Sequence, residues 1–371
     1  FFSSSFFAVA FFSALSFFAA GFFFFCGITA QGQGVVSTPR APSPAASVSQ
    51  TIGISTITVN YSRPSVKGRE IWGKLVPYGW NVDGFGGGNP APWRAGANEN
   101  TVLTITHPAT IEGHVVPAGS YGLFFTVNKD NTGEVVLSKD SKSWGSFWYD
   151  PKQDEMKEKI NLKDGPQTEM LTYDFREITA NSAELVLSWE KKQFPVKIGF
   201  AVDDIVMENA VEQLKGPVGF TWQGYASAAQ YSLQNKVDLE QGLKWADLAL
   251  QQHNSYTTLN LKAGFLNLTG HTSEGEKVMK DAIAIATENE LNQYGYQLLN
   301  QQQPDKAIET FILNTQRNPK SANAWDSLGE GYAIKGDKKN AILSFKKSLS
   351  LNPPPNTKAN SEKYLKQLGA M

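Results

Sequence analysis

Hydrophobic and polar residues alternate along several short segments between residues 46 and 200. In the first segment Ile57, Val59 and Tyr61 stand at every second position, with polar residues between them. Alternation with a period of two predicts a strand that buries one face. The same spacing recurs at residues 121–127, 184–189 and 194–198.

Turn-forming residues separate these segments. They occur at Glu112 and Gly113, and again at 117–119, 129–133 and 180–182. About eight to ten short strands at this spacing predict an antiparallel sandwich or barrel over residues 46–200. The glycine-rich residues 84–92 are expected to form an inserted loop rather than a strand.

A different periodicity begins at residue 203. Residues 203–214 have helical spacing and are followed by Gly216 and Pro217, which predicts a connecting helix over 203–217. From residue 222 onward a 34-residue period recurs. Its last unit carries Trp325, Leu328, Gly329, Tyr332, Gly336, Ala341, Phe345 and Pro353, and the unit before it carries Leu291, Tyr294, Gly295, Leu298, Ala307, Phe311 and Pro319.

This spacing resembles the tetratricopeptide repeat, in which each unit is a pair of antiparallel helices. Four units over about 222–357 would reach the number that buries a continuous core, and residues 361–368 would form a cap helix. We expect the last two paired helices to cross where Gly329 meets Ala341. The expected fold class is multidomain, with an antiparallel β-sandwich or barrel-like domain followed by an all-α tetratricopeptide-like repeat domain over residues 222–371.

The first 30 residues carry no charge, and phenylalanine, alanine and serine dominate them. Residues 28–30 would form the cleavage site of a secretory signal. We therefore expect a signal peptide over 1–30, a linker over 31–45, and a periplasmic or extracellular location. The run has neither an initiator methionine nor a basic segment, so we expect the chain to start further upstream.

Two alternatives to a cleaved signal remain open. The run is long enough to span a bilayer, so residues 1–30 would then anchor the protein in the inner membrane. Cys26 allows lipid attachment, although the bulky Phe25 precedes it. Any contact with a membrane is expected only through this segment.

Composition narrows the possible functions of the 371 residues. The 34 basic and 35 acidic residues give a net charge of −1, which does not favour nucleic acid as a partner. Cys26 is the one cysteine, so the rest of the chain has no disulfide, thiolate metal site or cysteine nucleophile. Because no metal spacing, phosphate-binding loop or nucleophile elbow occurs, we expect no cofactor and no metal, and the sequence does not favour an enzyme.

Charged and aromatic side chains concentrate between residues 62 and 101. In one interpretation the arginines of this stretch staple long loops in place, because they pair with Glu70, Glu99 and backbone carbonyls. In the other they line an anion pocket, with Trp72 among the stacking aromatics and an amide that orients the ligand. The candidate ligand-binding residues are Arg63, Lys67, Arg69, Tyr78, Trp93, Arg94, Asn98 and Glu99.

A second aromatic cluster contains Trp144, Trp148 and Tyr149. Packing in a core or an interface and stacking against a sugar or another ligand are both compatible with it.

Four blocks of sequence follow one another between residues 62 and 151: SRPSVKGREIWGKLVPYG, APWRAGANENT, PAGSYGLFF and SWGSFWYDP. They resemble a bacterial family of unknown function, DUF2911. The resemblance covers about 45–200 and implies an exported envelope protein of Bacteroidetes-like bacteria, with an all-β domain that a helical repeat tail frequently follows. It implies no activity.

The repeats indicate a partner. Resemblance to tetratricopeptide repeats implies a concave groove that binds a peptide or a protein, although the groove could instead dock on the chain's own β-domain. By repeat position the groove residues are neutral or acidic, so the basic clamp for a terminal carboxylate is missing. The candidates are Asn292, Tyr296, Asn300, Asp326 and Glu330.

The sequence therefore predicts an exported envelope protein that binds rather than catalyses. Its repeats would hold a protein or peptide, and its β-domain could take an anionic small molecule or a glycan. The alternative is a small-molecule or glycan hydrolase or binder that uses the arginine-rich loops.

Overall fold

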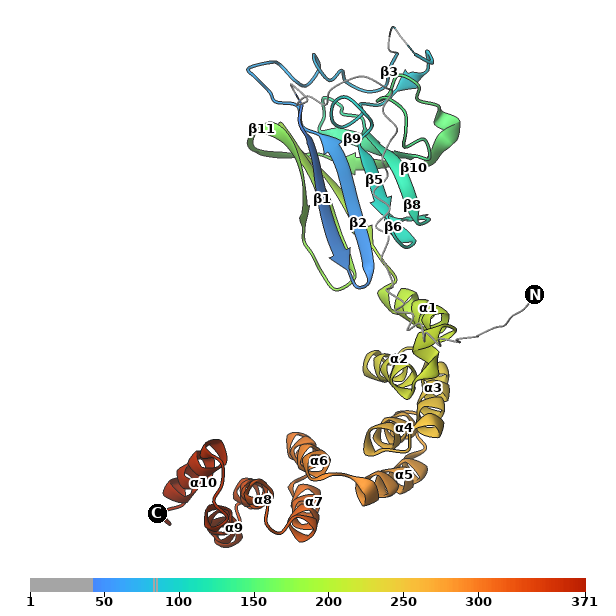
Figure 1. The fold of residues 1–371 in the computed structure, drawn as a ribbon. Coiled ribbons are helices and arrows are strands. Elements are labelled where there is room, and N and C mark those ends of the chain that lie inside the picture. The colour runs from blue at the N-terminus through green and yellow to red at the C-terminus, as the bar shows by residue number, and fades with distance from the viewer. Residues whose placement is uncertain (1–42, 83, 85) are drawn as a thin grey trace, which may run out of the picture. The chain divides into compact units, whose positions relative to one another are not determined.

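The computed structural model describes residues 43–82, 84 and 86–371, with antiparallel strands first and helices after them (Figure 1). The predictions for the signal, and for all but the end of the linker, lie outside the described residues. Among the described helices, none combines the length and the apolar character that crossing a bilayer requires.

The β-domain consists of two main antiparallel sheets and a small strand pair. The six-stranded sheet has the order β1-β2-β5-β8-β9-β10, with β1 (Ala45–Ile52), β2 (Ser55–Ser62), β5 (Val102–Ile105), β8 (Gly119–Phe125), β9 (Thr132–Ser138) and β10 (Asp154–Asn161). The four-stranded sheet has the order β11-β12-β6-β7, with β11 (Lys163–Arg176), β12 (Ser182–Gly199), β6 (Ala109–Ile111) and β7 (His114–Val116). Neither sheet closes on itself, so the sandwich expectation is confirmed and the barrel alternative is wrong.

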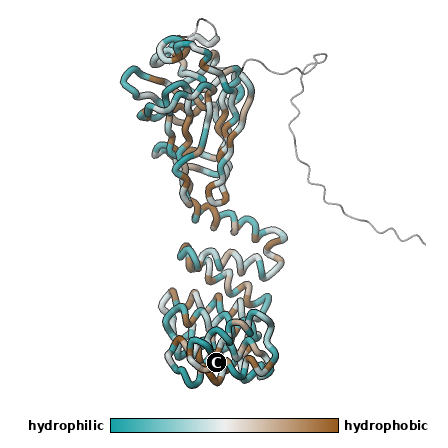
Figure 2. The backbone as a smooth tube through the Cα atoms, turned by 90° about the vertical axis from the view of Figure 1, so that its left-hand side faces the viewer, coloured by the Kyte–Doolittle hydropathy of each residue, from teal (hydrophilic) through white to brown (hydrophobic). Residues whose placement is uncertain are grey.

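One hydrophobic core lies between the two sheets. Ile57 and Val59 of β2 are fully buried in it, together with Leu185 and Leu187 of β12. Hydrophobic and hydrophilic residues interleave along the strands (Figure 2), and burial of the apolar set removes its surface from water. The period-two prediction for β2 is therefore confirmed.

Strand β8 departs from the one-face pattern because both of its faces are buried. Leu123 and Phe125 enter the main core, while Phe124 packs in a second cluster with Ala91 and Tyr149. The residues that cover this second face come from two loops distant in sequence. At the end of the predicted loop, β4 (Pro90–Ala91) pairs with β3 (Asn81–Val82), which lies just before the loop. The expectation of no strand over 84–92 is therefore wrong at residues 90 and 91.

Strand β12 joins the two segments that the sequence shows at 184–189 and 194–198. Glu190 lies between them with a φ of 53°. The two ends of β12 return to each other, because the Phe200 N–H donates to the Asn181 carbonyl at 2.8 Å. The apolar residues that β12 contributes to the main core stand at odd positions before Glu190 and at even positions after residue 193. A turn at Glu190 explains this change.

Ten helices of the described residues follow the strands (Figure 1). The predicted connecting helix is α1 (Val202–Leu214), and a short 3₁₀ turn (Pro217–Phe220) follows it. Four helix pairs then start at residues 222, 256, 288 and 322, which confirms the repeat period. They are α2 (Trp222–Asn235) with α3 (Leu239–Gln252), α4 (Tyr256–Leu268) with α5 (Thr272–Ile285), α6 (Glu288–Asn300) with α7 (Pro304–Arg317), and α8 (Ala322–Lys335) with α9 (Lys338–Ser350).

The paired helices cross at glycine, but the partner is an aromatic ring. A Cβ on Gly329 would lie 2.7 Å from Cδ1 of Phe345, and a Cβ on Gly295 would lie 2.3 Å from Cε1 of Phe311. The expected contact of Gly329 with Ala341 is therefore wrong as the reason for the glycine. A glycine is required because the ring of the second helix occupies the space that a side chain would take.

One further helix lies at each end of the array: α1 before the first helix pair and the cap helix after the last. Ile205 of α1 belongs to the core of the β-domain, while Met207 belongs to the first helical cluster. The cap helix α10 spans Pro355–Gln367 and starts six residues before the predicted 361–368. Its proline at the first helical turn explains the early start, because proline lacks only an N–H that would be unpaired there.

Candidate functional site

All three candidate arginines bond to backbone carbonyls, and Arg63 and Arg69 each donate from two nitrogens of the guanidinium. Arg63 donates from Nε to the Leu171 carbonyl at 2.9 Å and from Nη2 to Oγ1 of Thr172 at 2.6 Å. Arg69 donates from Nε to the Val66 carbonyl at 3.0 Å and from Nη2 to the carbonyl of Ser65. These contacts are those of the stapling interpretation, in which a guanidinium satisfies several carbonyls at once.

Arg94 lies beneath the second aromatic cluster. Its Nη1 donates to the Asn98 carbonyl at 2.7 Å, and its guanidinium stacks 4.6 Å from the centre of the Phe147 ring. Asn98 in turn donates from Nδ2 to the Ser43 carbonyl at 3.4 Å. Arg94 therefore contacts the backbone of Asn98 and the ring of Phe147, which belongs to the segment of the second aromatic cluster. The role of the Asn98 amide in orienting a ligand stays a prediction.

Trp93 belongs to a packed aromatic group. Its ring lies 5.8 Å from that of Trp72 in an edge-on arrangement and 5.8 Å from that of Trp189 in a stacked one. Trp72 donates from its indole nitrogen to Oε2 of Glu190 at 3.2 Å. Edge-on and stacked contacts of this kind stabilise a core, and both indoles remain only partly buried.

The remaining candidates of this stretch are more scattered. Lys67 is exposed, and its backbone N–H donates to Oε1 of Glu169 at 2.9 Å. Tyr78 packs over Gly73 and lies 5.8 Å from Nζ of Lys129. Glu99 is partly buried. Arg63, Arg69 and Arg94 bond to three different segments, and their role in ligand binding stays a prediction.

The second aromatic cluster divides into a buried and an exposed part. Tyr149 is buried, and its hydroxyl donates to Oδ2 of Asp154 at 2.6 Å. Trp144 and Trp148 leave 51% and 56% of their surface exposed. Tyr149 therefore packs in a core, whereas Trp144 and Trp148 do not, and both interface packing and stacking on a ligand stay predictions for the two tryptophans.

The repeat candidates lie on α6 and α8. Tyr296 of α6 donates from its hydroxyl to Oγ of Ser327 at 3.1 Å. Asp326 is only 5% exposed, and it accepts hydrogen bonds from Nδ2 of Asn360 at 2.7 Å and from the hydroxyl of Ser361. Asn360 also donates to Glu330. Both acidic side chains are therefore held by the cap helix, a partner that the sequence prediction did not include.

Burial raises the pKa of the Asp326 carboxyl, and the bonds from Ser361 and Asn360 oppose part of that rise. Burial likewise raises the pKa of Glu330, which also faces the like charge of Asp326. The ionised forms are disfavoured where water is excluded. Asn360 and Ser361 had no repeat signal that would have identified them.

The two asparagine candidates differ in environment. Oδ1 of Asn292 is buried and has no hydrogen-bond partner among the described residues. Asn300 is exposed at the end of α6. Within the part of the chain that the structure describes, no group of three His, Cys, Asp or Glu side chains is placed to hold a metal ion.

The fold defines a class of protein with a two-layer antiparallel β-domain and an array of helix pairs. Residues 43–198 match the family described as "Protein of unknown function (DUF2911)", which confirms the resemblance read from the sequence. No curated protein matches the chain.

Solved tetratricopeptide repeat proteins align with the helical part. YrrB, described as "a TPR protein with an unusual peptide-binding site", is 16% identical, with 43% of this chain and 84% of that one covered and a TM-score of 0.28. PilF of Pseudomonas aeruginosa is 20% identical, with 41% and 71% covered and a TM-score of 0.29. The C-terminal part of a TPR repeat-containing protein from Cytophaga hutchinsonii is 16% identical, with 44% and 72% covered and a TM-score of 0.29.

Proposed function

We propose that this protein is an exported binding protein whose helix pairs hold a peptide or protein partner. The observation that carries the proposal is the array itself, in which four helix pairs of similar length follow one another and a cap helix closes the end. Arrays of this kind present one extended surface built from the first helices of successive pairs.

The first helices of the last units lie side by side. The bond between Tyr296 and Ser327 links α6 to α8, and the bond between Asp326 and Asn360 links α8 to α10. Figure 1 shows α6, α8 and α10 in one layer, with α7 and α9 in the other. Polar side chains of the first layer can therefore act together on one extended ligand.

Amide side chains suit such a ligand. Oδ1 of Asn292 is a buried acceptor with no internal partner among the described residues, and Asn300 is exposed about two turns further along the same helix. An asparagine amide can accept and donate at the same time, which matches the N–H and C=O groups of a peptide backbone.

Export is part of the same proposal, and it rests on the sequence alone. The first 30 residues are uncharged and apolar, and the one cysteine lies among them. Cell fractionation of the full chain should recover it in the periplasm or the medium, and deletion of residues 1–30 should leave it in the cytoplasm. Recovery of both forms from the cytoplasm would contradict export.

Selection from a random peptide library on the full chain tests partner binding. The peptides recovered should bind the immobilised protein, and the double variant Asn292→Ala and Asn300→Ala should weaken their binding by about tenfold, a typical loss for interface side chains. Fluorescence anisotropy of the labelled peptides measures the dissociation constants.

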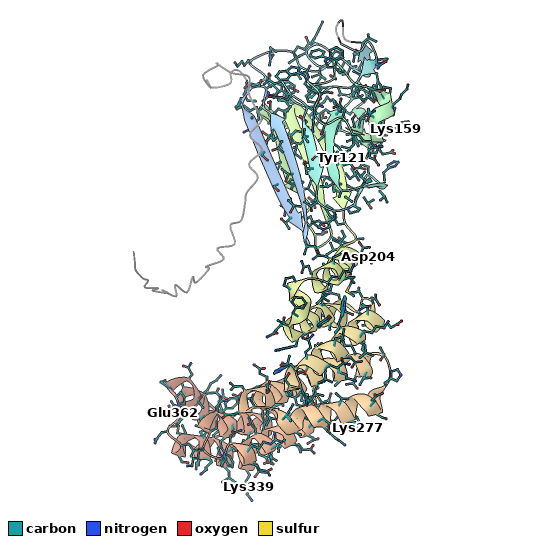
Figure 3. The ribbon with its side chains drawn as sticks, turned by 45° about the vertical axis from the view of Figure 1, so that its right-hand side comes forward. Tyr121, Lys159, Asp204, Lys277, Lys339 and Glu362 are labelled. Carbon is teal, nitrogen blue, oxygen red and sulfur yellow. The ribbon has the colours of Figure 1, made fainter. Side chains whose placement is uncertain are left out.

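Two lysines provide the matched control. Lys277 of α5 and Lys339 of α9 are exposed on second helices, and their side chains project from the ribbon in Figure 3. Replacing both with alanine should leave peptide affinity unchanged. The proposal fails if no peptide is enriched, or if the lysine variant loses as much affinity as the asparagine variant.

A further inference from the structure

The loop at residues 140–150, which we call the aromatic loop, displays two half-exposed indoles. Trp144 and Trp148 project from it, while Tyr149 is buried below. The two indoles stand four residues apart on one loop, and exposed aromatic side chains on one segment are typical of interaction sites. The sequence places both indoles outside the repeat array, and they stay half exposed although Arg94 stacks on the neighbouring Phe147.

The aromatic loop is held in a fixed conformation at its start. The backbone N–H groups of Lys142 and Ser143 both donate to Oδ1 of Asp140 at 3.2 Å. The carbonyl of Asp140 accepts from Nδ2 of the buried Asn100 at 3.1 Å. Two indoles on an ordered loop lose less conformational entropy on binding than two on a flexible one.

Arg94 and the glycine-rich insert fix the rest of the loop. Arg94 stacks on Phe147 from the inner side. From the insert, the Gly87 N–H donates to the Phe147 carbonyl at 2.7 Å, and Nδ2 of Asn89 donates to the Tyr149 carbonyl at 3.1 Å. The candidate Arg94 therefore positions the loop.

We propose that the aromatic loop binds a neutral saccharide, with Trp144 and Trp148 stacked on the sugar rings. The C–H face of a pyranose ring is apolar and its hydroxyl edge is polar, so it complements a flat aromatic surface bordered by hydrogen-bonding groups. Lys142 and Lys152 are exposed at the two ends of the loop and can bond to hydroxyls.

Charge favours a neutral ligand over the anion that the sequence suggested. Residues 140–152 contain two aspartates, Asp140 and Asp150, and two lysines, Lys142 and Lys152, so their formal charges cancel. Arg94, the guanidinium next to the loop, is already stacked on Phe147 and bonded to Asn98. An anion would therefore meet no excess of positive charge at the indoles.

Area favours a saccharide over a protein. A fully exposed aromatic side chain presents about 250 Å², so two half-exposed indoles offer roughly 250 Å² together. A stable protein partner buries about 800 Å² on each side. Two or three sugar rings cover the smaller area, and the aromatic loop alone does not support the larger one.

Titration of the full chain with neutral hexasaccharides tests the proposal. The probes are the β-1,4-glucose, β-1,4-N-acetylglucosamine and α-1,4-glucose hexamers, followed by isothermal calorimetry. At least one should bind, and Trp144→Ala and Trp148→Ala should each weaken it by about threefold to tenfold, as loss of one aromatic contact predicts. The single variants Trp144→Phe and Trp148→Phe, which keep a flat ring, should retain most of the affinity.

Phe220 provides the matched control, because it is 82% exposed in the turn after α1. Phe220→Ala removes an exposed aromatic elsewhere and should leave saccharide affinity unchanged. The proposal is overturned if no hexamer binds the wild-type chain at millimolar concentration, or if the alanine variants, folded by circular dichroism, bind as the wild type does. If an alanine variant does not fold, Trp144→Gln and Trp148→Gln replace it, because both side chains are half exposed and tolerate a polar residue. Wild-type affinity in the folded glutamine variants overturns the proposal. None of these outcomes depends on peptide binding by the repeats.

Discussion

The side-chain amide of Asn360 donates to Oδ2 of Asp326 at 2.7 Å, across a sequence separation of 34 residues. This separation is the length of one repeat, so the bond joins equivalent layers of successive units. It places a nearly buried carboxylate, which has no ion-pair partner among the described residues, between two helices. The end of the array is therefore fastened by polar contacts whose strength depends on the charge of Asp326.

Stability of the helical part should depend on pH through Asp326. Burial raises its pKa above the ordinary 3.8, so the folded chain binds more protons than the unfolded chain at intermediate pH. Stability therefore rises as pH falls through the folded pKa toward 3.8 and levels off below it. Asp326→Asn removes this component, so the wild type should gain stability relative to the variant between pH 7 and about 4.

Thermal unfolding followed by circular dichroism at several pH values measures this difference. Asp130 provides the opposite control, because hydrogen bonds from Thr132 lower its pKa. Asp130→Asn should therefore make the wild type lose stability relative to the variant as pH falls. A wild-type to Asp326→Asn difference that does not change with pH would contradict the assignment.

The glycine at the last helix crossing should not tolerate a side chain. Gly329→Ala places a Cβ 2.7 Å from Cδ1 of the fully buried Phe345. Overpacking costs about 1–3 kcal/mol, and the better helix propensity of alanine offsets about 1 kcal/mol. Urea unfolding should therefore show a net loss of up to about 2 kcal/mol. In the Phe345→Leu background, Gly329→Ala should cost less than it does in the wild type, and a purely additive double variant would count against the contact.

The sequence anticipated the elements better than their contacts. The period of two along Ile57, Val59 and Tyr61 identified a real strand because one face of β2 meets the core. The same rule misjudged β8, because Ala91 and Tyr149 cover its second face from loops distant in the chain. The period of hydrophobic residues within a strand cannot show which distant residues pack on its second face.

The candidate site shows the same limit. Charge and aromatic content singled out Arg63 and Arg94, but their partners Leu171 and Phe147 lie far along the chain. Asp326 lies on α8, the first helix of its pair, as its repeat position indicated. Repeat position could not show that Asn360 of the cap helix would donate a hydrogen bond to its carboxylate. Spacing assigns a face of a helix, and only packing between elements decides what meets that face.

Arg63 should contribute more to stability than an exposed arginine. Arg63→Ala removes donors from the Leu171 carbonyl and the Thr172 hydroxyl, which are part-buried, and an unpaired buried acceptor costs about 1–3 kcal/mol. Arg176→Ala breaks only an exposed pair with Asp174 at 3.4 Å, worth about 0–1 kcal/mol. Urea unfolding of the two variants compares these costs, and equal losses would refute the stapling role of Arg63.

Two glycines of the insert separate backbone strain from contact with the aromatic loop. Gly86 and Gly88 both have positive φ, 96° and 70°, so alanine at either is strained by about 1–3 kcal/mol. A Cβ on Gly86 would also lie 1.9 Å from the Phe147 carbonyl oxygen, whereas one on Gly88 would meet nothing within 4 Å. Gly86→Ala should therefore displace the aromatic loop as well as cost stability.

Acrylamide quenching of tryptophan fluorescence should change for Gly86→Ala and stay near wild type for Gly88→Ala. Saccharide affinity should fall for Gly86→Ala and stay near wild type for Gly88→Ala, because Phe147 lies on the same loop as both indoles. Equal quenching by the two variants would show that the insert does not position the loop.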